Sequence, residues 1–227
     1  LTGLAEGIAK YYVKCKDSFG NESGELEAIF SIELPISAKI EFSKEAPLSE
    51  GRVEITLTTS KIAEETPYLT YSYDGVSYSP IPLSGSGTVW KGYLIISANQ
   101  KEQIGSFKFQ SRDIEGNLGI EITKGEIFIV DTVAPSVITD VKAVGQDNGI
   151  KLSWSFKETV KEFKVYRSTS PNVDDSNFYK SLTAASFVDT SIDKGKTYSY
   201  RVSAVDTAGN EGPSSFEVYT TALLENA

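Results

Sequence analysis

The chain of 227 residues contains no histidine and no methionine, and Cys15 is its single cysteine. Without histidine it lacks the commonest general base and metal ligand, and one thiol can neither close an intrachain disulfide nor build a zinc site. These absences exclude most familiar catalytic machinery. We therefore expect no enzyme within these residues, with no catalytic, metal-binding or cofactor-binding residue and no cofactor.

Long apolar runs and an excess of positive charge are also missing. No stretch approaches the roughly 18 apolar residues of a membrane helix, so membrane insertion is not expected. Acidic residues outnumber basic ones by 31 to 22, giving a formal charge of -9 that repels nucleic acid. Because the sequence opens on Leu1, we interpret it as a piece of a longer protein with any export signal upstream.

A repeated segment organises what is present. It reads YYVKCKDSFGN at 11–21, FKFQSRDIEGN 96 residues later and YRVSAVDTAGN 93 residues after that. In each copy apolar or small residues alternate with polar ones, which predicts a half-buried strand. Each copy ends in Asp-x-x-Gly-Asn, which predicts a tight turn. The structural residues of these turns are Asp17, Gly20, Asn21, Asp113, Gly116, Asn117, Asp206, Gly209 and Asn210.

The length of the repeat predicts an all-β chain of tandem β-sandwiches without a helical domain, because a seven-stranded sandwich needs about 100 residues. We expect a two-strand remnant of a first unit over 1–34, a second unit over 35–134, a third over 135–222 and a tail over 223–227. The strands missing from the remnant lie outside this sequence, come from another chain or are replaced by packing on the second unit; we favour the first.

Individual strands follow from alternation and turn signals. The dipeptide Asp74-Gly75 predicts a hairpin that pairs Tyr71 with Tyr78 and places three tyrosine rings on one face. Single strands are predicted over 53–59, 89–96 and 120–130 in the second unit. In the third unit we expect strands at 137–144, 149–156, 161–168, 178–182, 186–190, 197–205 and 215–221.

The third unit resembles a microbial fibronectin type III domain through KLSWS at 151–155, KEFKVYRSTS at 161–170, SFVDT at 186–190 and GKTYSYRVSAVDTAGNEGPSS at 195–215. The resemblance implies a core tryptophan at Trp154, a tyrosine corner at Tyr198 and a sandwich built around Tyr200. Through YSYDGVSYSPIPL at 71–83, the second unit resembles bacterial immunoglobulin-like (Ig-like) modules of secreted or cell-surface proteins. In such proteins these modules are spacers or accessory regions, which implies an extracellular or cell-surface location.

Candidate sites compete with simpler interpretations. The carboxylate pairs 64–65 and 174–175 are interpreted as solvated charges. One carboxylate per repeated turn falls short of the six to eight oxygens that calcium prefers, unless Asp131 adds to a neighbouring turn. Cys15 is interpreted as a small inward residue. Four aromatic residues could stack on sugar rings, although the same alternation suits a sandwich core, which we favour for most of them. These residues are Trp90, Tyr71, Tyr73 and Tyr78.

The leading hypothesis is a noncatalytic structural spacer or accessory region that orients or stabilises neighbouring domains of the same polypeptide. One alternative is an adhesion module that binds a polysaccharide or a surface protein. Another is a surface-layer or filament subunit in which residues 1–34 assemble by β-strand addition.

Overall fold

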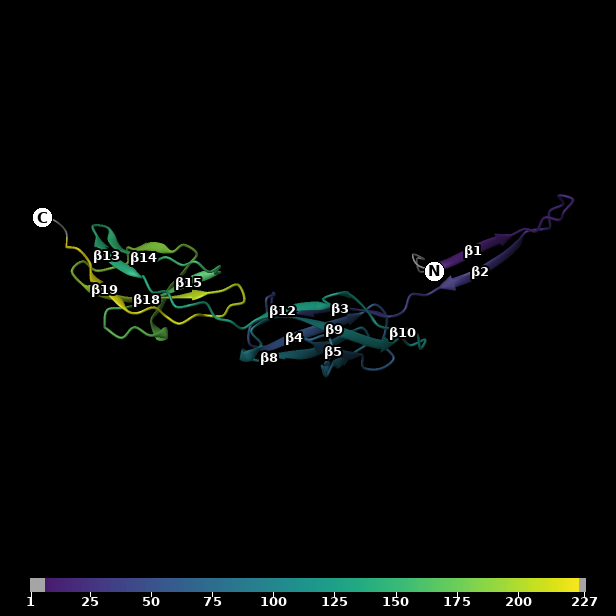
Figure 1. Cartoon of the computed structure of the whole chain (residues 1–227), viewed down its shortest axis with the longest axis horizontal. Helices are drawn as coiled ribbons and strands as arrows, with labels where there is room; N and C mark the ends of the chain where they lie inside the picture. Colours follow the sequence, from purple (N-terminus) through teal and green to yellow (C-terminus); the bar gives the residue numbers. More distant parts are fainter. Residues whose placement is uncertain (1–6, 225–227) are drawn as a thin grey trace.

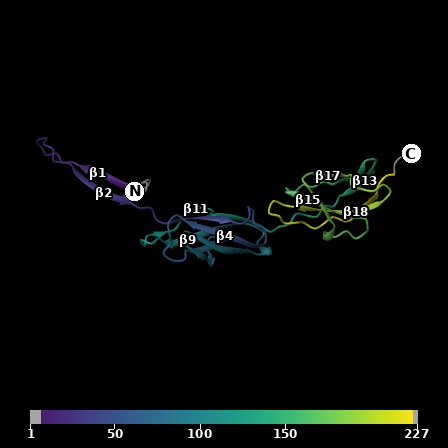
Figure 2. The ribbon, with the colours of Figure 1, turned by 180° about the vertical axis from the view of Figure 1, so that it is seen from behind.

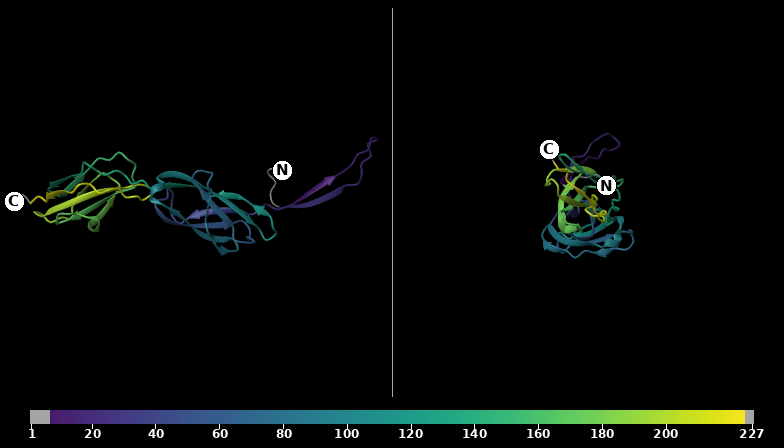
Figure 3. Two further views of the ribbon diagram at one scale, coloured as in Figure 1. Left: turned by 60° about the horizontal axis from the view of Figure 1, so that its bottom comes forward. Right: turned by 90° about the vertical axis from the view of Figure 1, so that its left-hand side faces the viewer.

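The computed structural model describes residues 7–224. Nearly all regular structure is β, and its elements form three groups that follow one another along the long axis (Figure 1). The same order is seen from behind in Figure 2 and in the left view of Figure 3. In the described part, helical structure is limited to the 3₁₀ turns η1 (Ala98–Gln100) and η2 (Asp175–Asn177). The predicted tandem all-β architecture is confirmed.

The first group is an antiparallel hairpin of β1 (Gly7–Val13) and β2 (Leu26–Ile32), whose register places Tyr11 opposite Ala28. In Figure 1 it extends away from the rest of the molecule. Cys15, which follows β1, is exposed, so the expectation of an inward cysteine is wrong for this structure. The reason is that no second sheet covers the hairpin within the described residues. Residues 1–6 of the predicted first unit and 225–227 of the predicted tail lie outside the described residues.

The middle group is a sandwich of two five-stranded sheets. One sheet has the order β11-β3-β4-β8-β7, formed by β11 (Glu121–Lys124), β3 (Ser37–Phe42), β4 (Gly51–Thr59), β8 (Val89–Ile96) and β7 (Ser84–Ser86). The other has the order β10-β9-β5-β6 with β12 also on β9, formed by β10 (Leu118–Gly119), β9 (Glu102–Arg112), β5 (Tyr68–Ser72), β6 (Ser79–Pro80) and β12 (Ile127–Asp131). Along β4 and β8 every second side chain is buried, because alternate residues face the opposite sheet.

The single strand predicted over 120–130 is two strands on different sheets. β11 runs parallel to β3, whereas β12 runs antiparallel to β9. Between them Gly125 adopts a φ of 80°, and a Cβ there would lie 2.2 Å from the carbonyl oxygen of Ile40. The chain therefore changes sheets at a position that favours glycine, which alternation alone does not reveal.

The predicted register of the Asp74-Gly75 hairpin is wrong by one residue, because Tyr71 pairs with Ser79 instead of Tyr78. The Asp74 carboxylate accepts hydrogen bonds from the backbone N–H groups of Val76 (2.8 Å) and Ser77 (2.7 Å), which lengthens the loop beyond two residues. A slip of one residue moves a side chain to the opposite face of the sheet. The three tyrosine rings therefore do not share one face.

The third group is a sandwich of three strands on four. The three-stranded sheet has the order β13-β14-β17, formed by β13 (Lys142–Gln146), β14 (Gly149–Ser153) and β17 (Ser186–Asp189). The four-stranded sheet has the order β16-β15-β18-β19, formed by β16 (Phe178–Leu182), β15 (Glu162–Ser168), β18 (Thr197–Val205) and β19 (Val218–Thr221). The first strand begins at Lys142, later than predicted. The Asp140 side chain, which precedes this strand, accepts a hydrogen bond from Ser155 N–H (3.0 Å). The segment before Lys142 is therefore held by a side-chain hydrogen bond and not by pairing with another strand.

Buried hydrophobic side chains form two separate clusters. One lies in the middle sandwich between Ile36 and Val130, and the other lies in the C-terminal sandwich between Ile138 and Ala222. No member is common to both. Each sandwich therefore has its own core, and only the segment 131–137 passes between them.

Candidate functional site: the joint between the two sandwiches

The three repeated Asp-x-x-Gly-Asn turns have nearly the same geometry. In each, an Asp carboxylate oxygen accepts the backbone N–H of the Asn four residues later, at 2.8 to 2.9 Å. The other carboxylate oxygen accepts the side-chain amide of the same Asn, at 2.9 to 3.2 Å. The glycine of each turn has a φ of 84° to 90°. The four-residue spacing thus closes the turn through one aspartate.

The surroundings of the three turns differ. Asp113 and Asp206 are buried at the ends of the two sandwiches, whereas Asp17 is exposed on the hairpin. Burial raises the pKa of Asp113, but its hydrogen bonds with Asn117 and the Lys61 ammonium 3.6 Å away outweigh burial and leave the pKa lowered. Both buried turns therefore place a hydrogen-bonded carboxylate where an apolar side chain would otherwise lie.

In both sandwiches a glycine two residues after the turn Asn contacts the incoming chain. A Cβ on Gly119 would lie 1.6 Å from the carbonyl oxygen of Ile36, and a Cβ on Gly212 would lie 2.3 Å from that of Pro135. No side chain fits at such distances. Each turn therefore provides a surface on which the backbone of the preceding linker lies directly.

Three further hydrogen-bonded contacts hold the segment between the sandwiches. The Asn210 side-chain amide donates to the Asp131 carbonyl at 2.9 Å, across 79 residues of sequence. On the middle sandwich, the Thr132 hydroxyl donates to the Ala98 carbonyl at 2.9 Å and accepts from Lys101 N–H at 2.9 Å. The Ser136 N–H donates to the carboxylate oxygens of Glu158 at 3.3 and 3.4 Å. The linker is thus fixed to both sandwiches, in addition to the restriction imposed by Pro135.

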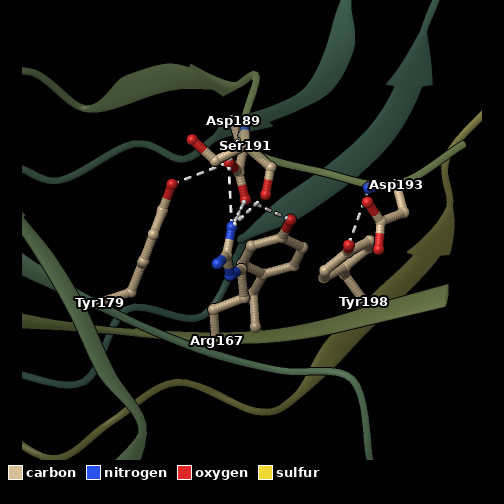
Figure 4. A network of polar contacts seen from close by, with 7 residues as sticks. Arg167, Tyr179, Asp189, Ser191, Asp193 and Tyr198 are labelled. Carbon is tan, nitrogen blue, oxygen red and sulfur yellow. Dashed lines mark hydrogen bonds and ion pairs between the residues drawn. The ribbon is translucent and has the colours of Figure 1, made fainter. Parts of the chain in front are cut away.

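A buried ionic network lies within the C-terminal sandwich, away from the joint. Figure 4 shows Arg167 reaching between Tyr179 and Tyr198 towards Asp189 and Ser191. One guanidinium nitrogen of Arg167 donates to Asp189 at 2.9 Å and to the Ser191 carbonyl at 2.9 Å, and the Tyr179 hydroxyl donates to Asp189 at 2.9 Å. The Asp189 side chain is fully buried. Burial raises the pKa of Asp189, but the arginine and the tyrosine hydroxyls outweigh it and lower the pKa.

The residues implied by the fibronectin resemblance are buried in the core of the same sandwich. The Trp154 ring packs edge-on against Phe163, with centroids 5.3 Å apart. The Tyr198 hydroxyl accepts the backbone N–H of Asp193 at 2.9 Å, which is the kind of bond that a tyrosine corner makes. The Tyr200 hydroxyl donates to Asp189 at 2.8 Å, and burial raises the pKa of this tyrosine.

The four aromatic residues considered for a sugar-binding surface are not gathered into one exposed row. Trp90 is 6% exposed and belongs to the core of the middle sandwich. Tyr71 and Tyr73 pack partly buried against the same core, and burial raises the pKa of Tyr73 to about 12. Tyr78 lies on the outer face, where the Lys108 ammonium is 3.9 Å from its ring centroid.

The carboxylate pairs are surface groups. Asp174 caps η2 by accepting the N–H of Ser176 at 2.9 Å, and Asp175, Glu64 and Glu65 are exposed. Across residues 7–224, no group of three or more acidic or cysteine residues is arranged to hold a metal ion. In that same range no helix is long and apolar enough to cross a membrane.

Sequence reasoning missed two of the residues that hold the linker, Thr132 and Glu158, which carry no local motif. Arg167 lies within the segment KEFKVYRSTS, but its part in a buried network was not predicted. One signal could have identified Asp189. It is a polar residue in an alternating strand, at a position where the pattern predicts an inward side chain. A buried carboxylate requires a partner, and the arginines of this unit are the candidates for that partner.

Comparison with known proteins gives partial matches. No family model matches the chain. It is 36% identical over 110 residues to an amylopullulanase of Thermoanaerobacter thermohydrosulfuricus, covering 46% of this chain and 8% of that protein. It is 32% identical over 87 residues to an amylopullulanase of Thermoanaerobacterium saccharolyticum, covering 38% and 7%. The chain therefore spans less than a tenth of the length of these curated relatives.

Among solved structures, the chain resembles the FN1-FN3 domains of chicken CNTN1, with a TM-score of 0.52 and 14% identity, over 95% of this chain and 78% of that one. At this identity the similarity concerns the fold alone. Together with the three-on-four strand order of the C-terminal sandwich, it confirms the fold that the sequence resemblance implied.

Proposed function

From the premise that the chain is a tandem array of Ig-like and fibronectin type III β-sandwiches, we propose that it is a noncatalytic accessory region of an extracellular bacterial hydrolase of the amylopullulanase type. Its task is to hold the parts on either side at a set distance and orientation. The partial sequence similarity to two amylopullulanases supports the parent enzyme class. Fold by itself does not decide function, so the argument for the orienting role comes from the joint.

The hydrogen-bonded joint is the observation that carries the proposal. A flexible linker would leave the two sandwiches free to reorient, whereas here Asn210 binds the linker from the C-terminal side and Thr132 binds it from the middle sandwich. The Gly212 backbone lies against Pro135, so the linker cannot move closer to the turn that contains Asn210. A linker held in this way suits a spacer that sets the angle between two sandwiches.

We also propose that the hairpin contributes two strands to a further sandwich of the same type. By the repeat, Tyr11 and Val13 occupy the positions of Phe107 and Phe109, which are buried in β9. In the hairpin they are 52% and 53% exposed, while the opposite face carries ion pairs between lysine and glutamate. An apolar face at core positions indicates that an opposing sheet covers it in the complete protein.

The experiment is small-angle X-ray scattering of the full chain and of joint variants. Asn210→Ala removes the bond to Asp131, and we expect a wider spread of interdomain angles. Gly212→Ala places a methyl group where the Pro135 carbonyl lies, and we expect a changed mean orientation. Asn117→Ala is the matched control, because it alters the same turn in the middle sandwich and leaves the joint intact.

The proposal predicts that the control scatters like the wild type and that the two joint variants do not. Circular dichroism and thermal unfolding establish that each variant keeps its fold. If the profiles of Asn210→Ala and Gly212→Ala superimpose on that of the wild type, the joint does not set the orientation and the proposal fails.

A further inference from the structure

Two neighbouring hollows form a groove over β5 and β9 in the middle sandwich. Two adjoining hollows, of about 330 and 460 Å³, share Tyr68 and Gln110 as lining residues. These two residues are paired across the strands, so their side chains lie next to each other on one face. The shared pair makes the two hollows one groove with Tyr68 at its centre.

Tyr68 is 59% exposed at the middle of this groove, although tyrosine is a large residue that usually buries its ring. The second tyrosine of the groove, Tyr78, stands in the larger hollow beside Lys108. Ile120, which is also exposed, lines the same hollow. Two tyrosine rings and an aliphatic side chain therefore offer apolar contact surface in the groove, whose larger hollow is mainly apolar.

Polar groups able to bind hydroxyls also line the groove, next to the apolar residues Leu118, Phe107, Phe109 and Ile122. Glu64, Glu65 and Arg112 line the smaller hollow, and Glu126 joins Lys108 in the larger one. One Arg112 nitrogen already donates to the Gly116 carbonyl at 2.6 Å, which fixes the direction of its side chain. Charges of both signs line the groove, so it carries no strong field of one sign and matches a neutral ligand.

We propose that this groove binds a neutral polysaccharide chain, with the ring of Tyr68 stacked on a sugar. A pyranose has an apolar face of C–H groups and a rim of hydroxyls, which fits an exposed tyrosine flanked by carboxylates, an amide and cationic side chains. The groove continues to both sides of Tyr68, so it suits a chain of several sugar units. We assign the bound polysaccharide to the α-glucans, and this choice rests on the proposed function.

The groove is a different surface from the sugar-binding surface that was considered from the sequence. Of the four aromatic residues in that hypothesis only Tyr78 lines the groove, and the central residue is Tyr68. Tyr68 was missed because it lies at the first position of a short strand, where alternation does not distinguish an outward ring from an inward one.

The test is affinity electrophoresis of the full chain in native gels containing amylopectin or pullulan, supported by calorimetry with maltoheptaose. We expect the wild type to be retarded and Tyr68→Ala to bind at least about tenfold more weakly, equivalent to ~1.4 kcal/mol. Tyr219→Ala is the matched control, because Tyr219 is 73% exposed on β19 of the other sandwich. Its retardation should equal that of the wild type.

Several outcomes overturn the inference. Wild type that is not retarded by either α-glucan refutes it, as does retardation that Tyr68→Ala leaves unchanged. Binding to cellohexaose without binding to maltoheptaose refutes the assignment to α-glucans. Binding to an anionic polysaccharide alone refutes the neutral ligand. The scattering of the joint variants is measured without a ligand, so failure of the groove and failure of the spacer function can be told apart.

Discussion

The buried carboxylate Asp189 gives a sharp test of what stabilises the C-terminal sandwich. In the wild type it accepts hydrogen bonds from Arg167, Tyr179, Tyr200 and the backbone N–H of Ser191. In Asp189→Asn one acceptor oxygen becomes an NH₂ group that faces other donors, and the Arg167 charge loses its partner. Separating a buried pair costs roughly 3–5 kcal/mol. Arg167 keeps the Ser191 carbonyl and the face of the Tyr179 ring, so we expect the low end, about 3 kcal/mol.

For a domain of this size, a loss of about 3 kcal/mol lowers the midpoint of thermal unfolding by roughly 10–20 °C. Differential scanning calorimetry measures this shift. Hydrogen exchange assigns it to a sandwich, because peptides from β15 and β18 should lose protection while those from β4 and β8 keep it. Asp193→Asn is the matched control, because this nearby carboxylate is exposed and pairs with Lys196 at the surface.

The same network predicts a pH dependence. Because the pKa of Asp189 is lowered in the folded state, the unfolded chain binds the proton more readily. The stabilisation is therefore present above about pH 4 and is lost as the pH falls through the lower folded pKa. The difference in unfolding free energy between wild type and Asp189→Asn should shrink as the pH falls from 5 to about 2. A difference that stays constant over this range, or a variant within ~0.5 kcal/mol of the wild type at pH 7, would refute the reasoning.

Three further predictions follow from packing. Gly105→Ala should destabilise the middle sandwich by about 1–3 kcal/mol, because the added Cβ would lie 2.1 Å from the Phe128 ring; an unchanged urea midpoint would contradict this. Tyr198→Phe should cost about 1 kcal/mol by removing the bond to Asp193, whereas Tyr219→Phe at an exposed site should leave the midpoint unchanged. In residues 1–227 alone, amides of β1–β2 should exchange much faster than those of β9, because an isolated two-stranded hairpin is marginal in water; equal protection would show that its apolar face is covered.

Much of the fold was predictable because its determinants are local. Alternation located β8, β16 and β18 at the predicted bounds, and the spacing in Asp-x-x-Gly-Asn located three turns. The failures have equally specific causes. The Asp74 side chain lengthened a loop and changed a register, and Gly125 divided one predicted strand between two sheets.

Local patterns were therefore enough to establish the all-β class and the repeat of turn and strand, since these depend on residues a few positions apart. The joint, the buried ionic network and the groove could be found only in the folded molecule. Asn210 and Asp131 are 79 residues apart, Arg167 and Asp189 are 22 apart, and Tyr68 meets Gln110 on a neighbouring strand. Contacts of this range depend on which strands pair and in what register, and alternation within one strand does not specify which strand is its partner.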